Sequence, residues 1–303
     1  MTVRGHEAWP PLQYEEWKDT YATLHMWMQV VGKVALACAP PINHSWGSAF
    51  QVTARGVSTY LLPHEERSFA VEFDFVDHQL RVDVSDGSSQ AHALRSQSVA
   101  DFYHDVMSLL QRMDLGVRIW SMPVEIPDPI AFEKDTIHHT YDPAAAHRCW
   151  QILARIVPVF AERRATFCGK TSPVHFFWGS FDLAVSRYSG RPAPPREGPR
   201  FMRDAYSHEV ISHGFWPGSG PMLEPAFYAY AVPEPAGLKE ATIEPSAAYY
   251  HRALGEFILP YEAVRTAPDP DAAIRAFIDS TYDRAATLAR WDRAGLERPA
   301  LTV

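Results

Sequence analysis

The sequence predicts an α+β protein built from two similar halves, each with the order helix, antiparallel strands, helix. Two observations support this fold class. Amphipathic stretches with helical spacing alternate with short strand-like runs, and the same order of elements occurs twice. A Trp-Gly-Ser motif also occurs once in each half, at Trp46 and at Trp178. We therefore expect two similar sheets, each flanked by helices and packed against the other.

The two motif segments resemble each other beyond the shared tripeptide. Residues 44–55 and residues 175–187 each begin with a histidine and end with an arginine. The tryptophan, glycine, serine and arginine match at a constant offset, and the histidines match after one inserted residue. This similarity favours an internal duplication. The alternative is a chance similarity between two hydrophobic strands.

Four long helices are predicted from apolar residues spaced three and four apart. Ser98 precedes Asp101 by three residues, which is typical of a helix N-terminus. The turn-like segment 267–270 marks the start of the last helix. The predicted helices span about 14–37, 98–113, 143–168 and 270–290.

The predicted strands are short apolar or alternating runs bounded by turn residues. Asp86-Gly87 is typical of a hairpin turn between two of them. Proline-rich segments at 192–199 and 217–221 indicate long loops in the second half. The strands are expected at 49–54, 57–62, 68–75, 79–84 and 90–95, and then at 174–178, 181–188, 207–213, 226–232 and 256–260.

The prolines of residues 121–142 favour extended backbone, so we expect this segment to connect the two halves. Residues 1–120 then form the first half, which serves as a scaffold. Residues 143–303 form the second half, and its more polar strands and long loops place the functional site there.

The composition is that of a globular protein, with 47% hydrophobic and 21% charged residues among 303. A net charge of −8 without a long Lys/Arg run argues against nucleic acid or an anionic membrane as the partner. No stretch has the character of a signal peptide or a membrane span. Three cysteines without CxxC spacing fit free thiols in a reducing compartment. We expect a cytoplasmic protein with a small-molecule ligand; the oligomeric state stays open.

Asp182 is the strongest single candidate for a functional side chain. It lies in an apolar strand, at the position where the first half has Phe50. A carboxylate among apolar residues is costly to bury unless it is paired or bound to a metal. The alternative is a structural Asp182, bonded to the backbone or to Arg187.

A histidine and carboxylate cluster follows in residues 208–213. Glu209 and His213 can converge in a strand, where they share a face, and also in a helix, where they are neighbours. The candidate catalytic residues are therefore Asp182, Glu209 and His213. The candidate ligands of a mononuclear iron or zinc ion are His175, Asp182, His208, Glu209 and His213. A solvated strand edge is the alternative interpretation of residues 208–213.

Aromatic residues of the second half can form the wall of an apolar small-molecule pocket, although the default role of such residues is the core. No residues are predicted to bind an organic cofactor. The candidate substrate-binding residues are Trp178, Trp216, Tyr228, Tyr230 and Arg187.

Three stretches resemble a family of uncharacterised bacterial proteins of about this length: WPPLQYEEWKDTYATLHMW from Trp9, PVHFFWGSFDLAV from Pro173 and AYSHEV from Ala205. The resemblance extends along the whole chain and implies a soluble bacterial protein. It implies no reaction, cofactor or catalytic residue.

Two functions are compatible with these observations. The first is an enzyme with a histidine and carboxylate site in the second half, either metal-dependent or a metal-free acid/base site, acting on a small molecule. The enrichment of ionisable residues in that half favours it. The second is a non-catalytic module that binds an apolar or aromatic small molecule, with the polar residues orienting the ligand.

Overall fold

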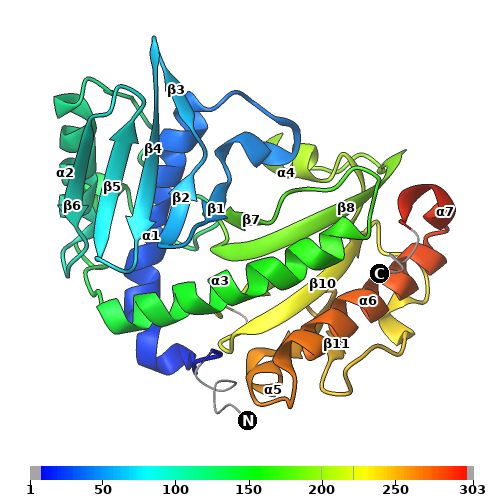
Figure 1. Cartoon of the computed structure of the whole chain (residues 1–303). Coiled ribbons are helices and arrows are strands. Elements are labelled where there is room, and N and C mark those ends of the chain that lie inside the picture. The colour runs from blue at the N-terminus through cyan, green and yellow to red at the C-terminus, as the bar shows by residue number, and fades with distance from the viewer. Residues whose placement is uncertain (1–7, 199, 221, 299–303) are drawn as a thin grey trace.

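The structure is a computed structural model that describes residues 8–198, 200–220 and 222–298. It confirms the α+β class. Twelve strands form one antiparallel sheet, with helices on both of its faces (Figure 1). The strand order is β11-β12-β10-β9-β8-β7-β1-β2-β4-β5-β6, with β3 paired to β4.

The first part of the chain forms the β1 side of the sheet. Both predicted long helices and all five predicted strands are present here, with small shifts at their ends, and β3 is an additional short strand. The elements are α1 (Tyr14–Cys38), the 3-10 helix η1 (Asn43–Ser48), β1 (Phe50–Val52), β2 (Gly56–Thr59), β3 (Leu62–His64), β4 (Arg67–Asp74), β5 (Gln79–Val84), β6 (Ser89–Ala93) and α2 (Val99–Arg112).

The second part of the chain forms the β7 side. The segment 121–142 that precedes it contains a single short 3-10 helix, η2 (Phe132–Lys134). Sequence analysis missed the short elements α4, η3, β11, α5 and α7. The elements are α3 (Pro143–Ala165), β7 (His175–Phe177), β8 (Asp182–Pro192), α4 (Arg200–Ala205), β9 (His208–Trp216), β10 (Ala226–Val232), η3 (Leu238–Glu240), β11 (Tyr249–His251), β12 (Glu256–Pro260), α5 (Tyr261–Arg265), α6 (Pro270–Leu288) and α7 (Arg293–Leu296).

The two sides share a sheet, which corrects the expectation of two separate sheets. Phe50 of β1 pairs with Phe176 of β7, and this contact joins the strands of both sides into one ladder. The internal repeat is not confirmed. The Trp46 motif lies in η1, before β1, whereas the Trp178 motif lies after β7, in the turn that leads to β8. The two motifs therefore occupy different places in the fold.

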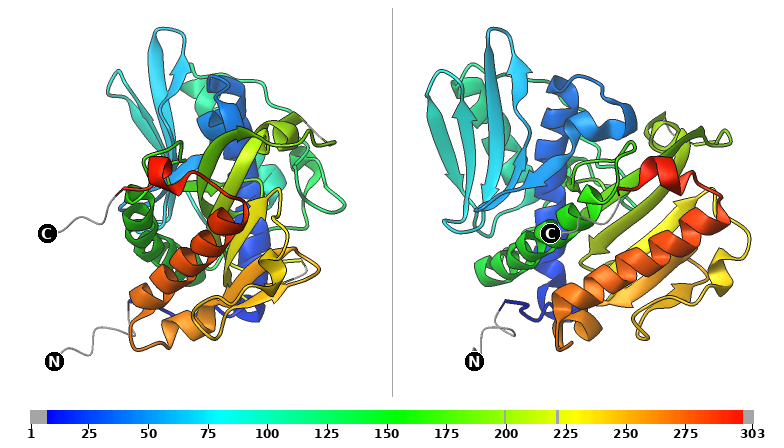
Figure 2. Two further views of the ribbon diagram at one scale, coloured as in Figure 1. Left: turned by 90° about the vertical axis from the view of Figure 1, so that its right-hand side faces the viewer. Right: turned by 45° about the vertical axis from the view of Figure 1, so that its right-hand side comes forward.

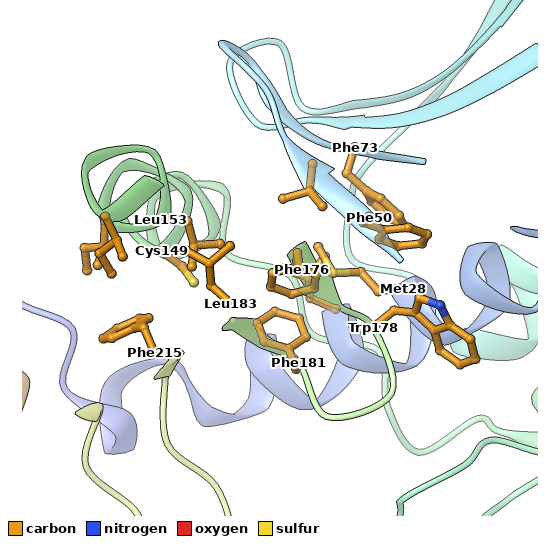
Figure 3. Packing of buried hydrophobic residues seen from close by; sticks show 14 of the residues in the cluster. Met28, Phe50, Phe73, Cys149, Leu153, Phe176, Trp178, Phe181, Leu183 and Phe215 are labelled. Atoms are coloured by element: carbon orange, nitrogen blue, oxygen red, sulfur yellow. The ribbon is translucent and has the colours of Figure 1, made fainter. Parts of the chain in front are cut away.

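Helices α3 and α6 cover one face of the sheet, and α1 lies on the other (Figures 1 and 2). Helix α1 is buried along most of its length because, on its face of the sheet, it packs against both the β1 part and the β7 part. Figure 3 shows side chains from both halves in one continuous core, which buries apolar surface across the β1–β7 contact. The labelled residues are Met28, Phe50, Phe73, Cys149, Leu153, Phe176, Trp178, Phe181, Leu183 and Phe215.

The helix starts follow local capping chemistry. The predicted cap at Ser98 is confirmed, since its side chain accepts a hydrogen bond from the backbone N–H of Asp101. Asp142 and Asp269 cap α3 and α6 in the same way. All three cysteines are free; Cys149 is buried, whereas Cys168, beyond the end of α3, is exposed.

Candidate functional site

A cavity of about 240 Å³ lies on the face of the sheet opposite α3 and α6. Strands β7, β8, β9 and β10 form its floor, and η1, α4, the end of α1 and residues 124–125 form its rim. The aromatic and polar residues that line the cavity include Trp46, Glu125, Trp178, Ser180, Asp182, Tyr188, Tyr206, Tyr228 and Tyr230.

Strand alternation decides which residues reach the cavity. On β8, β9 and β10 the even-numbered side chains line it and the odd-numbered ones point to the helices. Gly214 of β9 lies opposite Tyr228 of β10. A Cβ atom on Gly214 would be 2.3 Å from the Tyr228 hydroxyl, so the absence of a side chain there makes room for the tyrosine.

Asp182 is the buried carboxyl group of the site. It is the first residue of β8 and is 7% exposed. The hydroxyl groups of Ser180 and Tyr228 both donate hydrogen bonds to it. Burial raises the pKa of Asp182, and these two hydrogen bonds offset only part of the effect. The proton is therefore released less readily from Asp182 than from a carboxyl group in water.

Three tyrosines form a row that starts at Asp182: Tyr228 and Tyr230 on β10, and then Tyr206 before β9. The rings of Tyr228 and Tyr230 stack with their centroids 5.9 Å apart. The Tyr230 hydroxyl lies 3.2 Å from that of Tyr206. Burial raises the pKa of Tyr228 and of Tyr230 well above the ordinary value, with Asp182 adding to the effect at Tyr228 and Tyr206 at Tyr230. These hydroxyls therefore stay neutral hydrogen-bond donors at physiological pH.

Glu125 is a second carboxyl group at the cavity, and sequence analysis missed it. The residue has a left-handed backbone (φ 58) and is exposed as a whole, but desolvation of its carboxyl group at the cavity raises the pKa of that group to about 7, with Asp182 contributing. Its Oε1 lies 2.6 Å from the position that a Cβ on Gly179 would take. The glycine thus permits the close approach of the carboxyl group to the motif loop.

A buried glutamine holds both loops that carry these carboxyl groups. The Gln29 amide donates to the backbone oxygen of Val124 (2.7 Å) and accepts from its N–H (3.0 Å). It also donates to the backbone oxygen of Gly179 (3.2 Å). His25, one turn earlier on α1, contacts the same oxygen at 2.9 Å, and burial lowers the pKa of His25 to about 4. Helix α1 therefore positions the loops on either side of the cavity.

His44 and Lys170 link η1 to the second half at the cavity wall. His44 Nδ1 lies 3.1 Å from the backbone oxygens of Asp204 and Ala205, and its Nε2 lies 2.6 Å from Lys170 Nζ. This arrangement fits a neutral ring that donates from Nδ1 and accepts from the ammonium at Nε2. Burial and Lys170 both lower the pKa of His44, in agreement with a neutral ring.

The structure brings four of the sequence-predicted residues to the cavity: Asp182, Trp178, Tyr228 and Tyr230. It places Glu209, His213 and Arg187 on the opposite face, which the odd-numbered residues of β8 and β9 share. Glu209 pairs with Arg191 (2.6 Å), and His213 Nε2 contacts the Thr281 hydroxyl on α6 (3.0 Å). Arg187 packs over the Tyr282 ring and donates to the Arg163 backbone oxygen, so it is not bonded to Asp182 and does not line the cavity.

The remaining predicted residues, His175, His208 and Trp216, do not line the cavity. His175 is buried beside Trp46, and burial lowers its pKa to about 4. His208 lies at the start of β9, with its ring 6.1 Å from that of His44. Trp216 ends the same strand.

The predicted metal ligands are thus divided between the two faces of the sheet. Within residues 8–198, 200–220 and 222–298, no group of three or more His, Cys, Asp and Glu side chains is placed to hold a metal ion. Glu209 and His213 do share a face, as predicted, but the sheet lies between them and Asp182.

The fold and the cavity define an α+β protein with a small-molecule-sized cavity on one face of its sheet. The chain belongs to the family described as a family of unknown function, DUF5996, whose sequence profile matches residues 9–298. This confirms the resemblance seen in the sequence. Neither the curated proteins nor the solved structures include a significant match to the chain. None of the helices in the described parts of the chain has the length and apolar character needed to cross a bilayer.

Proposed function

We propose that this protein is an enzyme that performs acid/base chemistry on a small molecule bound in the cavity. The observation that carries the proposal is the presence of two carboxyl groups, Asp182 and Glu125, with raised pKa values at one cavity. Groups perturbed in this way, in a concave and largely apolar site, are typical of catalytic sites.

Glu125 is the proposed general base. A pKa of about 7 makes its carboxylate able to accept a proton near neutral pH and to release it again. Its access to solvent lets the proton exchange with water after each turnover. Gln29, through Val124, keeps the carboxyl group at the cavity, so Gln29 is a positioning residue.

Asp182 and Tyr228 are the proposed orienting and proton-donating pair. The two hydroxyl groups that bond Asp182 fix the direction of its carboxyl oxygens. Tyr228 is neutral at physiological pH and its single hydroxyl proton points to Asp182, so it donates to a substrate oxygen or nitrogen when that proton turns from Asp182 to the substrate. The aromatic walls hold the apolar part of the substrate. The mononuclear iron or zinc site is not part of this proposal, because the residues expected to form it lie on both faces of the sheet.

A binding module without catalysis is the second candidate, favoured by the aromatic share of the cavity wall. Incubation with a metabolite extract, analysed by mass spectrometry, separates the two functions. We expect a metabolite that wild type consumes and that the Glu125→Gln variant leaves intact. Glu16 is an exposed glutamate that does not line the cavity, so Glu16→Gln is the matched control and should retain turnover. A metabolite that binds wild type and is never converted would establish the binding module instead.

Two broader expectations remain proposals. From the β1–β7 contact outward, each side of the sheet follows chain order for its first strands, which supports a duplicated origin despite the different positions of the two motifs. The free cysteines support a function in a reducing cytoplasm. The proposal of a bacterial source rests on the sequence resemblance alone.

A further inference from the structure

We infer that the ligand of this cavity carries an organic ammonium group, such as a protonated amine, on an apolar body. The inference rests on the proposed function, since it assumes that the cavity binds a small molecule. It is carried by three features of the cavity: uncompensated carboxyl groups, aromatic walls, and no lysine or arginine among the lining residues that the structure describes.

The first feature is the missing counter-charge. Asp182 accepts hydrogen bonds only from neutral hydroxyl groups, and the ion pairs between described residues include neither Asp182 nor Glu125. Burying a carboxylate without a cation is unfavourable. An ammonium group bound between Asp182 and Glu125 would offset that cost and would hydrogen-bond to both.

The second feature is the aromatic wall. Indole and phenol rings have a negative face that attracts a cation, and tryptophan does so most strongly. Three of these rings, those of Trp46, Tyr188 and Tyr206, already attract cations from beyond the cavity lining. Lys170 Nζ is 5.1 Å from the Tyr188 ring centroid, and the Arg196 guanidinium carbon is 4.7 Å from that of Tyr206. The lining rings are Trp46, Trp178, Tyr188, Tyr206, Tyr228 and Tyr230.

The third feature is that the described lining residues provide no cationic side chain to pair with an anionic ligand. The Lys170 ammonium bonds His44 Nε2 and packs against the rings of Trp46 and Tyr188, and Lys170 is not among the residues that line the cavity. His44 is neutral. Glu256 on β12 adds a third carboxyl group on the cavity face of the sheet, next to Tyr230. Burial and Asp182 raise the pKa of Glu256 to about 7. An anionic ligand would face these carboxylates without a partner.

Isothermal titration calorimetry with three matched probes tests the inference. Benzylammonium, benzyl alcohol and benzoate share a ring and differ in charge. At about pH 8, where Glu125 is largely ionised, we expect benzylammonium to bind at least about tenfold more tightly than benzyl alcohol, and benzoate not to bind. At about pH 5.5 the preference for the ammonium should shrink, because Glu125 is then largely protonated. The titratable groups that face the cavity are Glu125, Asp182, Glu256, His44, Tyr206, Tyr228 and Tyr230, and the three tyrosines stay neutral over this pH range.

Variants identify the groups responsible. Asp182→Asn and Glu125→Gln should each remove most of the preference for ammonium while leaving alcohol binding within about threefold of wild type. Glu16→Gln should change neither. Equal or tighter binding of the alcohol or of benzoate would overturn the inference and leave acid/base catalysis standing. Binding of none of the three probes would overturn it too, while the turnover experiment with the metabolite extract judges the enzymatic proposal independently.

Discussion

Replacing Asp182 with asparagine should stabilise the folded protein at neutral and alkaline pH. Asp182 is 7% exposed, and burial raises the pKa of its carboxyl above the ordinary 3.8. Asparagine has nearly the same shape and carries no charge. Its oxygen can accept from one of the two hydroxyls that bond Asp182, and its amide can donate to the other.

The pH dependence follows from the direction of the pKa change. The unfolded chain releases the Asp182 proton more readily than the folded protein does, so the wild type loses stability as the pH rises above 3.8 and stops losing it above the folded pKa. The asparagine variant lacks this loss. Removing the buried charge outweighs the weakening of one charge-assisted hydrogen bond, and we expect a net gain of about 1–2 kcal/mol at about pH 8.

Urea unfolding followed by far-UV circular dichroism measures this effect. The gain should be present at about pH 8 and close to zero at about pH 4. Glu16→Gln, measured in parallel, should follow wild type at both pH values. A loss of more than about 3 kcal/mol at both pH values, the scale of a broken buried ion pair, would refute the reasoning. Asp182 would then hold the fold together by its charge.

Three further predictions test the site. Gly214→Ala places a methyl group 2.3 Å from the Tyr228 hydroxyl, so the tyrosine must move. Urea unfolding should show that the free energy of unfolding falls by about 1–3 kcal/mol, and calorimetry should show a weaker affinity for the ligand. An unchanged affinity would mean that Tyr228 does not shape the cavity. Gln29→Leu removes the side-chain partner of the Val124 N–H and of the Val124 oxygen, whereas the Gly179 oxygen keeps its contact with His25. Urea unfolding should show a loss of about 2–4 kcal/mol, and the pKa of Glu125 should fall toward its ordinary value; a neutral substitution would show that Gln29 positions nothing. For the substrate found in the extract, kcat/KM should fall as the pH drops below about 7, because protonated Glu125 cannot act as a base. If the Glu125→Gln variant kept this pH profile, the profile would belong to another titrating group.

The sequence was sufficient for elements whose pattern is local. Helix α1 and strands β4 and β5 follow from apolar spacing, and the Ser98 cap follows from a side chain and a backbone N–H three residues apart. The single sheet was not predictable in this way. It depends on the pairing of Phe50 with Phe176, two residues far apart in sequence whose strands are only three residues long.

The site was predicted in part for the same reason. Alternation along β9 correctly placed Glu209 and His213 on one face, but both faces of that strand are buried, and the pattern does not say which one meets the cavity. Asp182 stood out as a charge among apolar residues. Glu125 had no such signal, because its place depends on a left-handed backbone and on Gln29, a residue on a distant helix.

The most direct test of Glu125 as a base poised by the cavity is its own titration. Glutamate labelled with ¹³C at the side-chain carboxyl, followed by NMR from acid to alkaline pH, gives each glutamate pKa, and the Glu125→Gln variant identifies the signal. We predict a midpoint at about 7 for Glu125, with Glu256 the other glutamate titrating in that range. A midpoint near the ordinary value of 4.5 would contradict the account, because Glu125 would then be an ordinary surface carboxylate.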